Sequence, residues 1–324
     1  MSAPSFHPGA VRVRVPATSA NLGPGFDALG LAVGLHDEVV VQVTDGGLVV
    51  DVEGEGAADV PRDDTHLVVR ALHAAFDAMG GRPAGVRMVC TNRIPHARGL
   101  GSSAAAVVAG IAAARALVAD GARQLDDQAA LELATAFEGH PDNVAACLLG
   151  GLTVAWTEQT EQTDHTEQVE QHSAGHGRAR AVRLDPAAGL VAVALVPPTG
   201  VSTELARGLL PAQVPHADAA LNAGRAALLV EALTRRPDLL LPATEDRLHQ
   251  HQRGPAMPAS LALVAALRAD GLPAVVSGAG PTVLVLVAEH AAATVVARAG
   301  ELDAAFRAHV LPLQSAGAEV EPVA

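Results

Sequence analysis

Hydrophobic and polar positions along the first hundred residues follow two different periods. Residues 11–15 alternate valine with arginine, and this period of two predicts a half-buried strand. Valine-rich stretches at residues 39–43 and 48–52 predict two more strands, joined by a turn that contains two glycines. Between residues 65 and 79 the apolar residues recur at helical spacing, and the glycine pair that follows predicts the end of a helix.

The same patterns continue through the rest of the chain. A strand is predicted at residues 86–90, before the loop that leads into a strongly apolar helix at residues 102–118. The other segments with a helical period lie at residues 125–137, 204–209, 216–234 and 260–269, and apolar strands are expected at residues 190–196, 274–277 and 283–287. This mixture of strands and helices predicts an α+β architecture.

One segment, residues 157–180, breaks the pattern. It is rich in Thr, Glu, Gln and His and nearly free of apolar residues, so it buries too little surface to offset the entropy lost on ordering. Its three histidines would also suit a metal-binding tract, but a solvated low-complexity insertion is the favoured interpretation. We therefore expect an N-terminal domain at residues 1–156, this insertion, and a C-terminal domain at residues 181–324.

Length and composition narrow the class of protein. A chain of 324 residues exceeds the size of a typical single core, which predicts two domains. With a net charge of −13 and only 2% aromatic residues, the chain should repel nucleic acid, and it has few rings that could stack on bases. A nucleotide site is still compatible with this charge, because it needs only a local positive potential. Nucleic acid is therefore not an expected partner.

Membrane insertion and an oxidising compartment are not expected either. The long uncharged stretches at residues 99–114 and 271–288 are too short, or too interrupted by glycine and proline, to span a bilayer, so we interpret both as core. The first fifteen residues lack the continuous apolar run of a signal peptide. Cys90 and Cys147 cannot build a disulfide framework and are expected to be buried. We expect a cytoplasmic protein.

The most informative segment is a loop rich in glycine and serine, directly before the long apolar helix. Glycines let the backbone approach an anion closely, and the first turn of a helix presents unpaired N–H groups. The lysine of a Walker A loop is absent, so phosphate charge would be offset by the helix dipole, Mg²⁺ and an arginine. A simple helix cap is the alternative, but the whole pattern favours phosphate binding. The candidate ATP-binding residues are Pro95, His96, Ala97, Arg98, Gly99, Leu100, Gly101, Ser102, Ser103, Ala104 and Ala105.

This loop resembles the ATP-binding loop of the GHMP kinases, a family of small-molecule kinases. Two further segments, residues 16–27 and 277–282, resemble the N-terminal and the C-terminal glycine-rich motifs of this family, in the same order. The resemblance implies an N-terminal domain like ribosomal protein S5 with a left-handed β-α-β unit, a ferredoxin-like C-terminal domain and a homodimer. It also implies that Gly278 and Gly280 support the phosphate loop. Two residues implied near adenine are Thr65 and His66.

Three more segments, residues 138–151, 202–211 and 248–253, resemble sequences particular to the homoserine kinases within this family. That resemblance implies transfer of the γ-phosphate of ATP to the hydroxyl of L-homoserine, which gives O-phospho-L-homoserine for threonine biosynthesis. The alternatives are another GHMP kinase, acting on mevalonate, shikimate or a sugar, and a catalytically inactive module that only binds ligands. The third segment departs from the family, because histidine and glutamine stand where an aromatic pair is common before Arg253.

The resemblance also assigns roles to single residues. Arg207 and Arg253 would bind the substrate carboxylate, because a guanidinium group donates two parallel hydrogen bonds, and Arg207 would also assist the transfer. Asp27 would bind the ammonium group of the substrate. The residues implied around the substrate hydroxyl are Asn21, His140 and Asp142.

Catalysis without a conventional base and a magnesium site are the last expectations. Asn143 stands where some relatives place an aspartate base, and an asparagine side chain cannot take up a proton. Phosphoryl transfer tolerates this, because positioning and charge stabilisation supply most of the rate. Asp142 or His140 acting as proton acceptor is the less favoured alternative. For Mg²⁺ the resemblance implies Glu132 together with Ser103, with the preceding serine as the alternative to Ser103.

Overall fold

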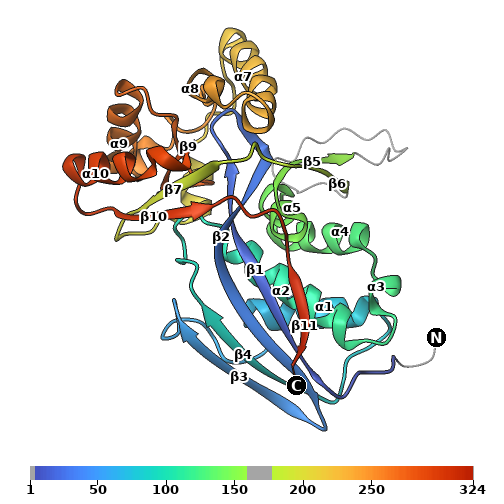
Figure 1. Ribbon diagram of the computed structural model, residues 1–324. Coiled ribbons are helices and arrows are strands. Elements are labelled where there is room, and N and C mark those ends of the chain that lie inside the picture. The colour runs from blue at the N-terminus through green and yellow to red at the C-terminus, as the bar shows by residue number, and fades with distance from the viewer. Residues whose placement is uncertain (1–3, 159–176, 324) are drawn as a thin grey trace.

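Two β-sheets organise the chain in the computed structural model, which describes residues 4–158 and 177–323 (Figure 1). Within these residues the first sheet has seven strands in the order β11-β1-β2-β4-β3, with β5 paired to β2 and β6 to β5. The second sheet of the described chain has four strands in the order β10-β7-β9-β8. The first sheet consists of β1 (Ala10–Asn21), β2 (Gly25–Thr44), β3 (Gly47–Gly54), β4 (Gly85–Asn92), β5 (Leu152–Glu158), β6 (Arg178–Leu184) and β11 (Glu319–Val323). The second consists of β7 (Leu190–Val196), β8 (Ala274–Val276), β9 (Val283–Ala288) and β10 (Arg307–Pro312).

Helices pack against both sheets, so the mixed α+β architecture predicted from the sequence is confirmed. Four of them, α1, α2, α4 and α5, lie on the same side of the first sheet (Figure 1). The α-helices are α1 (Leu67–Ala78), α2 (Ser102–Leu117), α3 (Gly121–Gln124), α4 (Asp127–Glu138), α5 (Asp142–Leu149), α6 (Thr203–Gly208), α7 (His216–Thr234), α8 (Leu240–Ala243), α9 (Pro258–Ala269) and α10 (Ala292–Leu302). Among the described residues, none of these helices is both long and apolar enough to cross a lipid bilayer.

Strands β3 and β4 pair in parallel, with α1 as the crossover between them, which makes a β-α-β unit. Strand β4 lies between β2 and β3, so the two strands predicted on either side of the glycine turn do not pair with each other. Burial gives the reason. Strand β3 buries only Val50 and Val52, whereas β4 buries Val86, Met88 and Cys90 along its length. The more apolar strand takes the interior position, and β3 is left at the edge of the sheet.

The second sheet has the strand order of a ferredoxin-like domain, with β7 and β9 in the centre. Every residue of β7 is buried, because its two faces meet two different cores. Ala192 and Ala194 face the core shared with the first sheet, while Val191, Val193 and Leu195 face the core beneath α9 and α10. This alternation follows from the period of two of a strand. The second sheet is therefore packed on both sides.

The chain crosses between the sheets more than once. Strand β6 still pairs with β5, and β11 returns from the second sheet to pair with β1. Residues 181–184 and 319–323 thus lie in the first sheet, although the sequence analysis assigned them to the C-terminal domain. The two ends of the predicted insertion form the β5–β6 hairpin, in which Glu158 pairs with Arg178. The middle of that insertion, residues 159–176, lies outside the described residues.

The two cysteines are buried and unpaired, as the sequence analysis expected. Cys90 is 1% exposed and Cys147 is 0% exposed. Burial disfavours the charged thiolate and raises the pKa of the Cys90 thiol to about 12. Both residues are therefore small core side chains without reactive character.

Candidate active site

The glycine-serine loop joins the end of β4 to the start of α2. Gly101 occupies the position before the helix with φ +70°, and in the described part of the chain no side-chain hydrogen bond is made at this cap. The cap residue is thus a glycine, which argues against the alternative of a simple serine cap. A Cβ atom at Gly101 would lie 2.0 Å from Oγ1 of Thr18. Only glycine fits at this position, both for its backbone angle and for the space around it.

The C-terminal glycine-rich motif packs directly on this loop. The hydroxyl of Ser277 donates to the carbonyl of Gly99 at 2.6 Å, and the N–H of Thr282 donates to the carbonyl of Arg98 at 3.2 Å. A Cβ atom at Gly99 would lie 2.2 Å from the carbonyl oxygen of Ser277. The glycine-serine loop is thus held by the turn between β8 and β9. This contact is consistent with the supporting role that the resemblance implied for Gly278 and Gly280.

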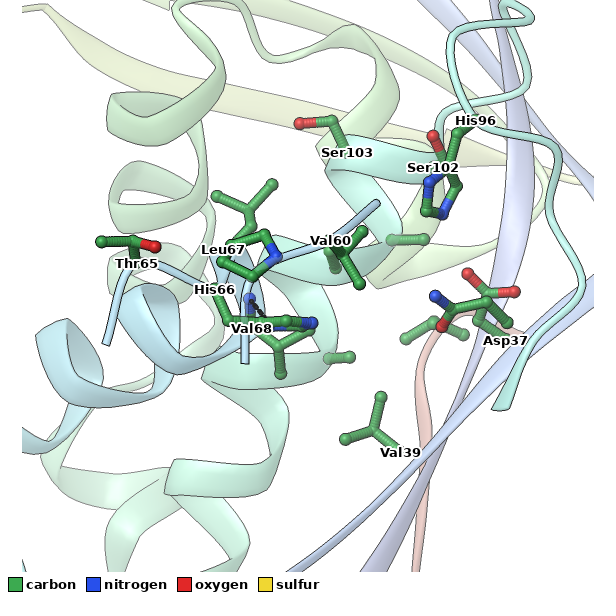
Figure 2. A pocket seen from close by; sticks show the side chains of 16 residues that line it. Asp37, Val39, Val60, Thr65, His66, Leu67, Val68, His96, Ser102 and Ser103 are labelled. Carbon is green, nitrogen blue, oxygen red and sulfur yellow. Dashed lines mark hydrogen bonds between the residues drawn. The ribbon is translucent and has the colours of Figure 1, made fainter. Parts of the chain in front are cut away.

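A first cavity of ≈ 300 Å³ opens beside the loop, between α1, α2 and β2 (Figure 2). Its walls are mostly apolar, and Val39, Val60, Leu67 and Val68 point into it. The predicted ATP-binding residues that line it are Thr65, His66, His96, Ser102, Ser103 and Ala105. An apolar slot beside a helix N-terminus suits a flat heterocycle attached to phosphate groups.

Two polar side chains of this cavity are held in defined states. His66 caps α1, because its Nδ1 accepts the N–H of Val68 at 3.2 Å. Burial lowers the pKa of His66, so the ring is neutral and carries its proton on Nε2. Asp37 accepts the N–H of Ile94 at 2.8 Å, and burial raises the pKa of its carboxyl group. The cavity thus contains a neutral histidine ring, His66, whose Nε2–H group can donate a hydrogen bond.

A second cavity of ≈ 400 Å³ meets the first at the N-terminus of α2, where Ser102 and Ser103 line both. It is markedly more polar than the first. Its charged and polar side chains are Asn21, Asp27, Ser102, Ser103, Glu138, His140, Asp142, Asn143, Thr203, Arg207 and Arg253. The structure therefore brings together all seven residues that were predicted for substrate binding and catalysis, from both halves of the chain.

Asp27 and Arg207 form an ion pair in this cavity. Nη2 of Arg207 lies 2.7 Å from Oδ1 of Asp27, and Nη1 lies 3.2 Å from Oδ2. Asn21 positions the acidic partner, because its Oδ1 accepts the N–H of Asp27 at 2.9 Å. The amide nitrogen of Asn21 donates to the carbonyl of Gly278 at 2.8 Å. The N-terminal motif is thereby tied to the C-terminal glycine-rich motif.

Arg253 is the most deeply buried cation of the cavity, with 1% of its surface exposed. Nη1 donates to the carbonyl of Gly278 at 3.2 Å and lies 3.1 Å from Nδ1 of His249. The guanidinium group also stacks over the ring of Phe26, 5.4 Å from its centroid. Its Nε is buried and has no hydrogen-bond partner among the described residues. The residue itself lines the second cavity, where a guanidinium group is suited to bind an anion.

His140, Asp142 and Asn143 form a hydrogen-bonded group at the start of α5. Oδ1 of Asp142 lies 2.8 Å from Nδ1 of His140 and accepts the N–H of Asn143 at 2.7 Å. The hydroxyl of Thr18 donates to Oδ1 of Asn143 at 2.7 Å. Burial disfavours the charged ring of His140, but the hydrogen bond to Asp142 and the negative charge of Asp142 together outweigh it, so the pKa of His140 is raised. A more strongly protonated histidine is a poorer proton acceptor at neutral pH.

The carboxylate beside Ser103 belongs to Glu138, not to Glu132. The hydroxyl of Ser103 donates to Oε1 of Glu138, and both side chains line the second cavity. Glu132 lines neither cavity; Gln128 donates to it at 2.9 Å, and Arg178 lies 4.0 Å away. The two glutamates are six positions apart on α4, which turns their side chains to different sides of the helix. The structure thus places Glu138 beside Ser103, and the magnesium role expected of Glu132 stays a prediction.

Several predicted ATP-binding residues support the loop without facing a cavity. Arg98 donates to the backbone carbonyls of His96, Pro197 and Pro198, at 2.9, 3.2 and 2.6 Å, so its guanidinium group is committed to the loop itself. A phosphate group bound at this loop would therefore need other groups to offset its charge. The other predicted residues that line neither cavity are Pro95, Leu100, Ala104 and Gly280.

Sequence reasoning missed four residues of this region. Glu138 lines the second cavity, and Thr18 donates a hydrogen bond to Asn143, which also lines it. The rings of Phe26 and His249 stack with their centroids 5.1 Å apart, and Arg253 packs on the ring of Phe26. Thr18 and Phe26 lie inside the N-terminal motif itself, so that motif was the available signal. His249 lies four positions before Arg253, a spacing that places two side chains on one side of a helical turn.

Comparison with known proteins identifies the family. A model described as the GHMP kinases N terminal domain matches residues 66–151, and one described as GHMP kinases C terminal matches residues 219–302. Homoserine kinases of Streptomyces avermitilis and Streptomyces coelicolor are 61% and 60% identical to this chain over 324 residues, which covers 100% of this chain and 100% and 98% of theirs.

The solved structures agree with this result. A crystal structure of homoserine kinase from Cytophaga hutchinsonii superimposes with a TM-score of 0.77 and 26% sequence identity, and the match covers 99% of this chain and 100% of that one. Mevalonate diphosphate decarboxylase from Staphylococcus aureus shares the fold at 16% identity, with a TM-score of 0.67, over 97% of this chain and 98% of that one. From its motifs, its fold and these relatives, the chain belongs to the homoserine kinases of the GHMP kinase family.

Proposed function

We infer that this chain transfers the γ-phosphate of ATP to the hydroxyl of L-homoserine, giving O-phospho-L-homoserine and ADP for threonine biosynthesis. The observation that carries this proposal is the junction of two cavities at the N-terminus of α2. One cavity is apolar and fits adenine, and the other is polar and fits an amino acid. Ser102 and Ser103 lie where the two meet, so a triphosphate bridging the cavities would present its last phosphate to the polar side.

The polar cavity suits the three functional groups of L-homoserine. The guanidinium groups of Arg253 and Arg207 both line this cavity and are suited to bind a carboxylate. Asp27 offers an acceptor for the ammonium group. The hydroxyl would then lie towards His140 and Asn143, on the side of the cavity that holds Ser103. This arrangement favours an amino acid over mevalonate or a sugar, which lack an ammonium group.

We propose that Mg²⁺ is held by Ser103 and Glu138 together with phosphate oxygens of ATP. Burial raises the pKa of the Glu138 carboxyl group, so a cation at this place would stabilise the ionised form. Within the described residues, no three His, Cys, Asp or Glu side chains form a metal cluster, which fits a magnesium ion that shares its ligands with phosphate. When bound, Mg²⁺ neutralises phosphate charge in place of the missing P-loop lysine.

The residues of the chain act mainly by positioning. The substrate oxygen attacks the γ-phosphorus, the bond from that phosphorus to the β,γ-bridging oxygen breaks, and the hydroxyl proton leaves with the transferred group or to solvent. Asn143, fixed by Thr18 and by the N–H that it donates to Asp142, can hold the hydroxyl but cannot take its proton. His140 is oriented by Asp142 and, with its raised pKa, adds positive character beside the transferred group.

The wider context of the enzyme is proposed from the resemblance and from composition. We propose a cytoplasmic homodimer whose partners are the two small substrates. The net charge of −13 disfavours binding to nucleic acid. Both cysteines are free and buried, which suits a reducing compartment.

A coupled assay of ADP release tests the proposed function. Purified enzyme with ATP and Mg²⁺ should turn over L-homoserine, and should release much less ADP with mevalonate or galactose. The Ser103→Ala variant is the control for ADP release that does not depend on the site, and we expect at least about a 100-fold loss of turnover. Turnover of L-homoserine no faster than in this control would refute the proposal.

A further inference from the structure

The side chain of Arg98 joins the glycine-serine loop to a second segment of the chain, the connection from β7 to α6 (residues 197–202). Nη1 donates to the carbonyl of His96 at 2.9 Å, Nε to that of Pro197 at 3.2 Å, and Nη2 to that of Pro198 at 2.6 Å. One acceptor lies in the loop and two lie in the connection, although the two segments are far apart in the sequence. The planar guanidinium group therefore bridges them with all three of its nitrogens.

The sequence of the connection suits this contact. A proline has a fixed φ and restricts the residue before it to extended backbone, so Pro197 and Pro198 hold their carbonyl groups in defined directions. Gly200 follows, and a Cβ atom there would lie 2.4 Å from Nη1 of Arg98 and 2.8 Å from the carbonyl oxygen of Ala97. The connection can approach the loop this closely only because position 200 is a glycine.

Backbone atoms make a second link between the two segments. The N–H of Val201 donates to the carbonyl of Ala97 at 3.1 Å. Ala97 has φ +53°, a left-handed conformation that an alanine keeps only where its surroundings hold it. Helix α6 begins directly after this link, because Ser202 accepts the N–H of Leu205 at 3.1 Å and caps the helix. The start of α6 is thus fixed to the glycine-serine loop.

Both sides of this contact reach the second cavity. Ala97 and Gly99 of the loop line the cavity, and so do Thr203 and Arg207 of α6. The loop is where we propose that the phosphates of ATP bind, and α6 carries one of the arginines proposed to bind the acceptor. The contact made by Arg98 therefore fixes the acceptor side of the cavity relative to the donor side.

We propose that Arg98 is a positioning residue that holds α6 on the glycine-serine loop, so that a nucleotide bound at the loop also stabilises the acceptor side of the cavity. This inference rests on the proposed function, and it gives Arg98 a contact between two parts of the chain in place of a contact with phosphate. When the loop and α6 are joined, the first ligand bears the entropic cost of ordering both, and the second ligand meets an ordered site. By linkage, each ligand then raises the affinity for the other by the same factor.

Two substitutions of Arg98 separate its charge from its shape. Arg98→Lys keeps the positive charge, but one ammonium group cannot donate to three carbonyls in the directions of a guanidinium group, and Arg98→Met removes both features. We expect the two variants to behave alike. The Kd of ADP with Mg²⁺ should stay within about twofold of that of the unmodified chain, and kcat/KM for L-homoserine should fall by about tenfold.

Arg93→Met is the matched control for this pair of variants. Arg93 also lies between β4 and α2, but its guanidinium group donates to Glu38 at 2.9 Å and not to the β7–α6 connection. Because this ion pair is exposed, its loss should leave the Kd of ADP and kcat/KM for L-homoserine within about twofold. A Kd of ADP that rises by about tenfold in Arg98→Met but not in Arg98→Lys would mean that the charge of Arg98 acts on phosphate, and it would overturn the inference.

Hydrogen exchange measures the contact without any reaction. In the unmodified chain, ADP with Mg²⁺ should slow the exchange of backbone N–H groups in the loop and also in α6, by about tenfold in the helix. In Arg98→Lys the loop should still be protected, but the change in α6 should be less than about twofold. Mass spectrometry of peptides that cover residues 95–105 and 201–210 measures both. If ADP protects only the loop in the unmodified chain, or protects α6 equally in Arg98→Lys, the inference is wrong.

Gly200→Ala tests the same contact from the side of the connection. It leaves Arg98 and its charge in place, but its Cβ atom collides with the backbone of Ala97, so ADP should no longer protect α6. Gly208→Ala is its matched control, because a Cβ atom at this last residue of α6 would meet no other atom of the described chain within 4 Å. In this control the protection of α6 by ADP should stay within about twofold of that in the unmodified chain.

These measurements separate the inference from the proposed function. Protection of α6 that requires Arg98, in a chain that does not phosphorylate L-homoserine, would support the inference and refute the proposed function. Turnover of L-homoserine by a chain in which ADP never protects α6 would do the opposite. If both Arg98 variants fail to fold, the unmodified chain and Gly200→Ala still decide, because ADP must protect α6 in the first and not in the second.

Discussion

The carboxyl group of Glu138 lies at the last residue of α4, where it meets the first turn of α2. It accepts a hydrogen bond from the hydroxyl of Ser103, and burial raises its pKa above that of an ordinary glutamate. Because a divalent cation binds only the ionised form, a metal at this place competes with a proton. At the magnesium site that we propose, this one side chain would therefore link magnesium binding to pH.

We expect the Glu138→Gln variant to lose about 100-fold in kcat/KM for ATP, because the amide cannot supply the negative charge that holds Mg²⁺. In the unmodified enzyme, the Mg²⁺ concentration that gives half the maximal rate should rise as the pH falls, because protons then compete with Mg²⁺ for Glu138. Since the pKa of Glu138 is raised, this rise should begin at a higher pH than it would for an ordinary glutamate. Titration of Mg²⁺ in the coupled ADP assay at several pH values measures both effects.

Glu132→Gln is the matched control, because it makes the same change on the same helix outside both cavities. It should leave kcat/KM for ATP within about twofold, since its contacts are an exposed ion pair and one amide. If instead Glu132→Gln abolishes the magnesium dependence and Glu138→Gln does not, the position assigned from the sequence is the right one.

These two glutamates also show how far residue types could be predicted. A motif assigns a carboxylate to the region, but which glutamate of α4 lies beside Ser103 depends on where the helix ends. Asp27, Arg207 and Arg253 were predicted from distinctive segments and from the charges that an amino acid carries, and the structure brings the three to one cavity. Thr18 and His249 were missed because their role is to hold another side chain, and that role follows from packing.

At the scale of elements, the loop between β4 and α2 depends on glycines at two close approaches. Gly99 has φ +76°, and a Cβ atom there would lie 2.2 Å from one backbone oxygen and 2.9 Å from another. Both oxygens belong to the Ser277–Gly280 turn of the second sheet. Backbone atoms cannot move aside as a flexible side chain can, so these contacts fix the distance between the two glycine-rich motifs.

The Gly99→Ala variant should therefore lose about 3 kcal/mol or more of unfolding free energy, from backbone strain together with the collision. Gly271→Ala is the matched control, because this glycine also has a positive φ, +81°, but a Cβ atom there would meet no other atom of the described chain within 4 Å. It should lose only about 1 kcal/mol. Urea unfolding curves compare the two, and equal losses would mean that the contact with the second sheet contributes nothing.

Element prediction succeeded where the apolar pattern was strong. Helix α2 and strand β7 are apolar almost throughout and were predicted near their observed bounds. The pairing of β4 between β2 and β3 was not predicted, because the turn at residues 45–47 looks local while the pairing is set by the α1 crossover. Strand β11 was missed because its residues are mostly exposed, so it lacks the alternation of apolar and polar residues that marks a half-buried strand. Glu319 and Glu321 pair with Arg14 and Arg12, which lie at the other end of the chain.

At the scale of the whole molecule, the two sheets do not have independent cores. One continuous hydrophobic cluster contains Val13 and Leu31 of the first sheet and Ala192, Leu284 and Leu286 of the second. In the described part of the chain, only the outer side of the second sheet has a separate cluster, beneath α9 and α10. Strand β11 also ties the C-terminal end of the chain to the first sheet. The second cavity is assembled across this shared core, which holds its two sets of charges at fixed positions.

A shared core predicts that the two sheets unfold together. Trp156, the single tryptophan of the chain, lies on β5 in the first sheet, so its fluorescence reports on that sheet, whereas far-UV circular dichroism reports on all helices and strands. We expect the urea midpoints of the two signals to agree within about 0.2 M, as in a two-state transition. A fluorescence transition clearly separated from that of circular dichroism would mean that one sheet stays folded after the other has unfolded. The second cavity would then lie at the interface of two units that fold independently.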